Sequence, residues 1–222
     1  MSEITNESKF YAMVDRTRLI QRWSLMRNNT TENVAEHSFQ TAVFAHALAL
    51  IRQERFPEKL QVDANLVATK ALFHDASEVI TGDLPTPVKY HNIELKKSYK
   101  ELEALAVGDL LQMLPEDLRK HYIDLLEEKE ISEYPEGSEE QVIAKLVKAG
   151  DKLSAYVKCL SEVAQGNNEF REAKESTKVK LDDIATDLEE VRIFMDEFIP
   201  AFELSLDQLK SKDLSSFDEG VN

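Results

Sequence analysis

The sequence predicts an all-α protein, and three observations lead to that prediction. Apolar side chains recur with the helical period along most of the 222 residues. The chain has only 6 glycines and 6 prolines, which leaves few positions for turns. No convincing run of alternating apolar and polar residues indicates a strand. We therefore expect a single helical bundle over residues 1–209, followed by a polar, disordered tail over 210–222.

The N-terminal part of the sequence is expected to contain three helices. Asn33 is the expected N-cap of the second helix, with Glu36 as its capping-box partner, and this places His37 in the first turn. The third helix is expected to carry His74 and Asp75. The three helices are expected at about residues 9–23, from 33 to about 52, and from 63 onward.

The segment Thr81–Pro87 follows the third helix and is expected to be a rigid, non-helical loop. Pro85 and Pro87 restrict their own backbone and that of the residue before each of them. Further helices are expected at about residues 94–114, 115–129, 139–165 and 174–197, with a short one after Pro200.

The composition excludes several classes of protein. A net charge of −15 argues against binding to long nucleic acids, because contact with a phosphate backbone needs basic patches. No apolar stretch is long enough to span a membrane, and the N-terminus shows no signal peptide, so no membrane association is expected. The one cysteine, Cys159, cannot form an internal disulfide, which favours a cytoplasmic location. Its simplest interpretation is a buried hydrophobic side chain.

One cluster of polar residues stands out, formed by His74, Asp75 and, one helical turn later, Glu78. It ends an apolar helical run, where an imidazole beside carboxylates is costly unless the charges are paired or bound to a metal. His37 and Asp151 are the other candidate ligands, and Asp151 follows Gly150 on a predicted helix. Two imidazoles and two carboxylates suit Mn²⁺, Fe²⁺, Co²⁺ or Zn²⁺ better than Ca²⁺.

The remaining histidines are expected to be structural or exposed: His46, His91 and His121. His46 comes nine residues after His37, which places it on the opposite side of a helix. For His74 taken alone, a hydrogen-bonded histidine of the core is the simpler interpretation. The metal interpretation depends on the combination of all the candidate ligands.

The order His37, His74-Asp75, Asp151 on helices resembles the HD-domain metal-dependent phosphohydrolases. Longer segments resemble, more narrowly, the YfbR-like bacterial 5'-deoxynucleotidases. The similarity covers nearly the whole chain and is poor in the first residues, in 130–140 and in the tail. The segments that carry it are 22–28, 31–38, 74–90, 151–160 and 166–170.

This resemblance implies an enzyme that hydrolyses 2'-deoxyribonucleoside 5'-monophosphates to the deoxynucleoside and inorganic phosphate. The implied enzyme is selective against ribonucleotides, broad for the base and homodimeric. The resemblance also implies one divalent metal ion, Co²⁺, Mn²⁺ or a similar transition metal. Its implied ligands are His37, His74, Asp75 and Asp151.

The resemblance also implies roles for substrate-binding residues. Glu78 would transfer protons, and Arg22 would bind the phosphate with its planar, permanently charged guanidinium. Trp23 would crowd the sugar 2'-position, and Asp83 would accept a hydrogen bond from the 3'-hydroxyl. The other residues implied to contact substrate are Leu84, Pro85, Thr86, His37, Asp75 and Asp151.

Three alternatives remain open from the sequence. The first is another HD-domain activity, on nucleoside triphosphates, cyclic nucleotides or guanosine polyphosphates. The second is a non-catalytic module that binds a nucleotide or a metal. The third is a structural helical adaptor in which the His/Asp cluster is a hydrogen-bonded core network.

Overall fold

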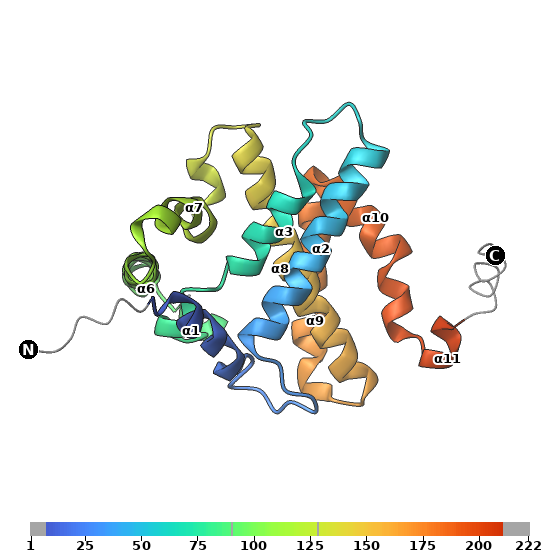
Figure 1. Ribbon diagram of the computed structural model, residues 1–222. Coiled ribbons are helices and arrows are strands. Elements are labelled where there is room, and N and C mark those ends of the chain that lie inside the picture. The colour runs from blue at the N-terminus through green and yellow to red at the C-terminus, as the bar shows by residue number, and fades with distance from the viewer. Residues whose placement is uncertain (1–7, 90, 128, 211–222) are drawn as a thin grey trace, which may run out of the picture.

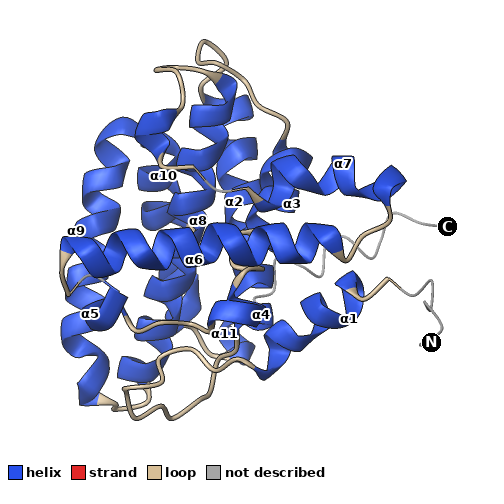
Figure 2. Cartoon of the chain, turned by 90° about the vertical axis from the view of Figure 1, so that its left-hand side faces the viewer, coloured by secondary structure: helices blue, strands red, loops and turns tan. Residues whose placement is uncertain are grey.

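The computed structural model describes residues 8–89, 91–127 and 129–210, and its chain is traced in Figure 1. Over these residues the chain forms helices joined by loops, as Figure 2 shows. The one extended pairing among them is an isolated antiparallel bridge between Gln21 and Asn33. The all-α prediction is confirmed. The predicted tail lies outside the described residues except for Lys210.

Eleven α-helices and four short 3₁₀ segments make up the described chain. The α-helices are α1 (Phe10–Val14), α2 (Val34–Arg55), α3 (Ala64–Phe73), α4 (Glu78–Thr81), α5 (Thr86–Lys89), α6 (Ile93–Gln112), α7 (Glu116–Leu126), α8 (Glu139–Ala164), α9 (Arg171–Asp187), α10 (Glu189–Glu197) and α11 (Leu206–Leu209). The 3₁₀ segments are η1 (Asp15–Leu19), η2 (Ile131–Glu133), η3 (Asn168–Phe170) and η4 (Ile199–Glu203). None of the described helices combines the length and the apolar character that crossing a bilayer requires.

Two core clusters hold the bundle together. Helix α2 packs against α3 and α8 at the centre of the larger cluster, which α9 and α10 complete (Figure 1). The smaller cluster joins α1, α6 and α7. The turn between α3 and α4 connects the two, because Ala71 belongs to the larger cluster and Ala76 to the smaller one. His74 and Asp75 therefore lie where the two cores meet.

Helix α2 begins as the sequence predicts. The Oδ1 of Asn33 accepts a hydrogen bond from the backbone N–H of Glu36 at 3.0 Å. The Glu36 carboxylate accepts one from the backbone N–H of Asn33 at 3.2 Å. This capping box satisfies two backbone donors at the helix start, and it fixes His37 in the first turn.

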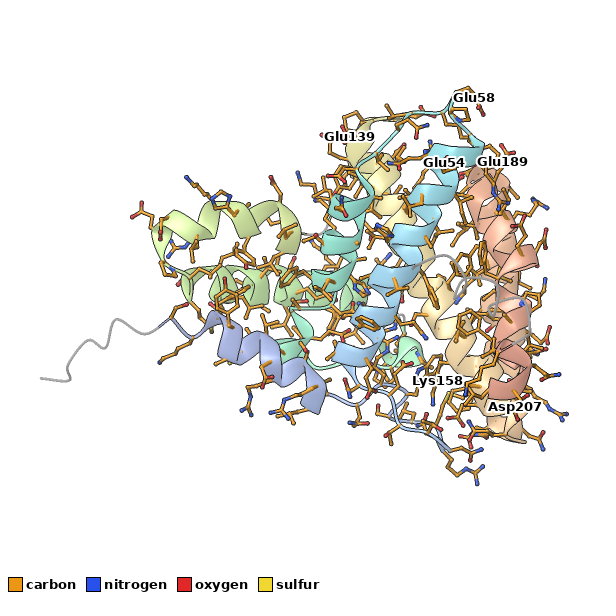
Figure 3. The ribbon with its side chains drawn as sticks, turned by 45° about the vertical axis from the view of Figure 1, so that its right-hand side comes forward. Glu54, Glu58, Glu139, Lys158, Glu189 and Asp207 are labelled. Atoms are coloured by element: carbon orange, nitrogen blue, oxygen red, sulfur yellow. The ribbon has the colours of Figure 1, made fainter. Side chains whose placement is uncertain are left out.

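The other end of α2 is held by a buried ion pair. Arg52 donates through Nη1 to Glu190 Oε1 of α10 at 2.7 Å, and through Nε to the Leu60 carbonyl at 2.8 Å. In Figure 3 the labels Glu54 and Glu189 mark this end of the bundle, and Lys158 lies toward the opposite end. Removing one member of such a pair would leave a buried charge without its partner.

The predicted helix over residues 9–23 is wrong in its second half. Helix α1 ends at Val14, η1 continues to Leu19, and Ile20 is extended with φ −96° and ψ 112°. The physical reason is a backbone pairing with a distant segment. Arg22 N–H donates to the Glu32 carbonyl at 2.9 Å, and Val34 N–H donates to the Ile20 carbonyl at 3.0 Å.

The third and last long helices also differ from the prediction. Helix α3 ends at Phe73, so the His74–Ser77 segment is a turn and Glu78 begins a separate helix, α4. The predicted helix over 174–197 is divided at Leu188, whose φ of −116° and ψ of 87° leave the helical region. Leu188 is buried, and the break turns α10 so that it also packs into the larger core.

The prediction of a non-helical Thr81–Pro87 loop is wrong at both ends. Thr81 is the last residue of α4, and Gly82 then leaves the helix with φ 74°. Residues Thr86–Lys89 form α5. Pro87 is the second residue of α5, where a backbone N–H would have no partner within the helix, so proline is tolerated there. Only residues 82–85 form the loop itself.

Candidate metal centre and active site

The four predicted metal ligands meet at the centre of the bundle. His37 comes from α2, His74 and Asp75 from the turn after α3, and Asp151 from α8. Nε2 of His37 lies 3.2 Å from Asp151 Oδ1 and 3.5 Å from Asp75 Oδ2. Nε2 of His74 lies 3.2 Å from Asp75 Oδ2. Ligand atoms of His37, His74 and Asp151 all lie within 4.8 Å of one another.

The second nitrogen of each imidazole is held from outside the cluster. Nδ1 of His74 lies 2.6 Å from the Ala71 carbonyl, which can only accept, so this nitrogen carries the proton. Nδ1 of His37 lies 2.9 Å from Ser154 Oγ, which donates its own proton to Gln40 Oε1 at 2.7 Å. Ser154 therefore accepts from His37. In the neutral form of each imidazole, these contacts leave the lone pair on Nε2, as a metal ligand requires.

The charge states of the cluster suit a divalent cation. Burial lowers the pKa of His37, and the positive charge of Arg22 lowers it further, so this imidazole is neutral. Burial alone would raise the pKa of Asp151, but Lys152, His37 and His74 together outweigh that effect and hold it well below its ordinary value. Neutral imidazole nitrogens beside ionised carboxylates form the mixed donor set of a transition-metal site. The residues present therefore fit one divalent ion.

Glu78 lies at the edge of this cluster as the first residue of α4. Its side chain is buried, and its Oε2 has no hydrogen-bond partner among the described residues. Burial, followed by the nearby charges of Asp75 and Asp83, raises the pKa of Glu78 to about 10. The carboxyl therefore keeps its proton at neutral pH in the metal-free protein. The helical turn expected between His74 and Glu78 is absent, and a backbone turn brings Glu78 to the site instead.

Arg22 reaches the site from the segment that follows η1, and Trp23 is its neighbour in that segment. Arg22 Nη1 donates to Asp75 Oδ2 at 3.4 Å, and Arg22 Nε donates to Glu32 Oε1 at 3.0 Å. Burial would lower the pKa of Arg22, but the carboxylates led by Asp75 outweigh it and raise the pKa. The Trp23 ring packs against Phe170, with 5.3 Å between ring centroids.

The loop with Asp83 is held by Tyr99 of α6. The Tyr99 hydroxyl donates to the Gly82 carbonyl at 3.0 Å. Burial raises the pKa of Asp83, and the Arg22 charge opposes that rise, which places Asp83 within electrostatic range of the site. Leu84 and Pro85 are half-buried beside it. The backbone places Thr86 at the start of α5, and its side chain lies outside the described part of the structure.

Sequence reasoning missed the residues that support the site. Ser154 is three residues after Asp151, so helical spacing could have indicated its role on the same face of α8. Lys158 and Glu162 have the spacing of a surface ion pair, but both are buried. Glu162 accepts the backbone N–H groups of Asn29 and Thr30 at 2.9 and 3.0 Å, and so holds the loop after Trp23 against α8. No local sequence pattern indicated the contact between Glu162 and this loop.

The fold is that of the HD-domain phosphohydrolases. An HD-domain phosphohydrolase from Listeria innocua matches with a TM-score of 0.72 at 22% identity, over 95% of this chain and 96% of that one. The cyanophage S-2L HD phosphohydrolase DatZ, solved with dA and one catalytic Zn²⁺, matches with a TM-score of 0.51 at 20% identity, over 85% and 95%. Similarity at this level of identity defines the class of fold.

Within that class, the chain belongs to the family described as 5'-deoxynucleotidase YfbR-like, whose pattern matches residues 9–202. It is 47% identical to the 5'-deoxynucleotidase YfbR of Escherichia coli over 203 residues, 91% of this chain and 96% of the relative. It is 46% identical to a 5'-deoxynucleotidase of Erwinia tasmaniensis over 207 residues, 93% and 98%. The predictions of this family and of a hydrolase are confirmed.

Proposed function

We propose that this enzyme hydrolyses 2'-deoxyribonucleoside 5'-monophosphates to deoxynucleoside and inorganic phosphate, with selection against ribonucleotides and tolerance of all bases. The observation that carries the proposal is the convergence of His37, His74, Asp75 and Asp151 beside the buried carboxyl of Glu78. The relatives named 5'-deoxynucleotidase, at 46–47% identity over nearly the whole chain, support the substrate class.

One divalent ion, Co²⁺, Mn²⁺ or a similar transition metal, would be held by His37, His74, Asp75 and Asp151. When bound, such an ion supplies a Lewis acid that polarises a phosphoryl oxygen and lowers the pKa of coordinated water. The zinc-containing cyanophage structure supports a metal in this fold.

The protein's own groups would bind the phosphate and move protons. Arg22 remains charged at every accessible pH, and it would offset charge on the non-bridging phosphate oxygens. Glu78, protonated at Oε2, would donate its proton to the 5'-oxygen as the bond from phosphorus to that oxygen breaks. The attacking water forms the new bond to phosphorus, and its released proton returns to Glu78, which restores the starting state.

The sugar would be selected on two sides. Trp23 would occupy the space that a 2'-hydroxyl needs, and its packing on Phe170 supports a fixed ring position. Asp83 would accept a hydrogen bond from the 3'-hydroxyl, beside Leu84, Pro85 and Thr86. These contacts leave the base without an assigned partner, which is the basis for proposing broad base tolerance.

The test measures inorganic phosphate and pyrophosphate released from dAMP, AMP and dATP with Co²⁺ or Mn²⁺ added, in wild type and Trp23→Ala. Wild type is expected to release phosphate from dAMP with a kcat/KM about 10–200-fold above that for AMP, the range over which a pocket excludes one small group. In Trp23→Ala this ratio is expected to fall about tenfold or more, because the space for the 2'-hydroxyl opens.

Leu25→Ala is the matched control for Trp23→Ala, because Leu25 is an exposed apolar side chain two residues away. Its dAMP/AMP ratio is expected to equal that of wild type. An unchanged ratio in Trp23→Ala would remove Trp23 from sugar selection. Faster release of pyrophosphate from dATP than of phosphate from dAMP would favour another HD-domain activity.

We also propose that the enzyme is a cytoplasmic homodimer. Phe39, Val43 and Leu50 are exposed at spacings of four and seven residues, which places them on one face of α2. An exposed apolar stripe of this kind is typical of a protein–protein interface. Sedimentation equilibrium at micromolar concentration is expected to give twice the mass of the 25.3 kDa chain, and the monomer mass would contradict the proposal.

A further inference from the structure

We infer that Glu32 is a positioning residue that couples phosphate binding to sugar selection. The inference rests on the proposed function, in which Arg22 holds the phosphate and Trp23 excludes the 2'-hydroxyl. A single carboxylate oxygen, Glu32 Oε1, accepts a hydrogen bond from Arg22 Nε at 3.0 Å and another from Trp23 Nε1 at 3.1 Å. One atom therefore fixes two neighbouring side chains relative to each other.

The contact with Arg22 is strong enough to orient the guanidinium. The side chains of Arg22 and Glu32 are only 13% and 12% exposed, so solvent screens the pair far less than it screens a surface ion pair. A charge-assisted hydrogen bond in such surroundings is stronger than a neutral one. With Nε bound to Glu32, Nη1 of Arg22 is directed toward Asp75, one of the candidate metal ligands.

The contact with Trp23 holds a side chain whose backbone is strained. Trp23 has φ 57°, in the left-handed region that side chains with a Cβ rarely adopt. The backbone N–H of Arg22 donates to the Glu32 carbonyl at 2.9 Å, which brings the two segments side by side. The indole N–H then reaches the Glu32 carboxylate, so Glu32 and Phe170 together define the position of the ring.

The fold of this region does not depend on the Glu32 side chain. Glu162 accepts the backbone N–H groups of Asn29 and Thr30, and Asn167 donates to Glu162 at 2.7 Å. The loop between Trp23 and Glu32 therefore stays attached to α8 when the Glu32 carboxylate is removed. Glu32→Ala is expected to fold, and circular dichroism checks this.

Glu36 provides a matched control. Glu32 and Glu36 line the same cavity, which has a volume of about 230 Å³ between the start of α2 and α8. The described contact of the Glu36 carboxylate is with the backbone N–H of Asn33, and none joins it to Arg22 or Trp23. Glu36→Gln removes a negative charge from the same neighbourhood and keeps the oxygen that accepts the Asn33 N–H, so it controls for charge while the capping box that fixes His37 stays intact.

The first readout does not depend on activity. Trp23 is the only tryptophan in the chain, so intrinsic fluorescence reports its environment alone. Glu32→Ala is expected to increase quenching by acrylamide and to shift the emission maximum, because the indole loses its hydrogen-bond partner. Glu36→Gln is expected to match wild type, and Glu32→Gln, which keeps an oxygen acceptor, is expected to lie between wild type and Glu32→Ala.

The second readout is the kinetic split between dAMP and AMP. Glu32→Ala is expected to raise KM for dAMP about tenfold, the loss of roughly one charge-assisted hydrogen bond, with a smaller change in kcat. The dAMP/AMP ratio of kcat/KM is expected to fall in the same variant. Partial recovery of both quantities in Glu32→Gln supports positioning by the acceptor oxygen.

Two results would overturn the inference. One is unchanged Trp23 fluorescence in Glu32→Ala, whatever the activity. The other is an equal change of KM and selectivity in Glu32→Ala and Glu36→Gln, which would assign the effect to charge alone. A wild-type enzyme without preference for dAMP would instead refute the proposed function, and the fluorescence result would still decide whether Glu32 holds Trp23.

Discussion

Replacing Glu78 with glutamine is expected to lower kcat on dAMP by about 10²–10⁴-fold, the usual contribution of a general acid–base group. The amide keeps the size of the side chain and cannot deliver a proton. Phosphate release in wild type and Glu78→Gln, at equal metal occupancy measured by elemental analysis, tests this. Turnover like that of wild type in the variant would show that Glu78 is not the proton donor.

The same variant is expected to become more stable as its activity is lost. In the metal-free folded protein the pKa of Glu78 is raised from 4.5 to about 10, so the unfolded chain releases this proton first. The contribution of Glu78 to the stability of wild type therefore falls as the pH rises above about 4.5, and Glu78→Gln lacks this loss. At pH 8, without metal, the unfolding midpoint of the variant is expected to lie about 2–4 °C or more above wild type.

The comparison between two pH values is the control for this prediction. At pH 4 both the folded and the unfolded wild-type protein carry the proton on Glu78, so the difference between the midpoints of variant and wild type should nearly vanish. A Glu78→Gln protein that is less stable than wild type at pH 8 would contradict a Glu78 carboxyl whose pKa is raised by its burial.

Replacing Gly150 with alanine is expected to destabilise the protein by about 1–3 kcal/mol and to weaken metal binding. A Cβ at this position would lie 2.8 Å from the Thr41 carbonyl oxygen and 3.0 Å from Ala45 Cβ, both on α2. Backbone cannot yield as a flexible side chain can, so α8 must move away from α2. His37 and Asp151 lie on these two helices, and the move would separate them.

Gly108→Ala is the matched control for Gly150→Ala. Gly108 lies inside α6, and no atom of the described residues beyond its own helix backbone lies within 4 Å of the position its Cβ would take. Alanine there is expected to stabilise the protein by about 0.5–1 kcal/mol, because glycine is the poorer helix former. Thermal unfolding and metal titration of both variants give the comparison. A Gly150→Ala protein as stable as Gly108→Ala would contradict the close contact of α2 and α8.

The sequence predicted the bundle because its signals are local. Helical periodicity and the Asn33–Glu36 capping box depend on neighbours a few residues apart, and the helix start at Val34 is where they place it. The candidate ligands His37, His74, Asp75 and Asp151 could be predicted from the sequence for another reason. Side chains of these types next to apolar helical runs are costly unless a partner compensates them.

Several errors of prediction share one cause, which is a contact made far along the chain. The helix expected through Trp23 ends early because residues 20–22 pair with residues 32–34. The break after Phe73 lets Ala71 and Ala76 pack into different cores. Glu32 and Glu162 were missed because their contacts depend on the path of a loop, which the periodicity of the sequence does not indicate. Glu32 binds Trp23, and Glu162 binds the backbone of residues 29 and 30.

Because α2 packs against helices that come much later in the sequence, its contacts form only late during synthesis. His37 and Ser154 touch although they are 117 residues apart in the sequence, and Arg52 and Glu190 are 138 apart. A ribosome makes about 5–20 residues per second. The apolar faces of α2 and α3 therefore stay uncovered by α8 for several seconds, until α8 leaves the ribosome. During that interval the chain carries His37, His74 and Asp75 but lacks Asp151, so the site cannot close until α8 is made.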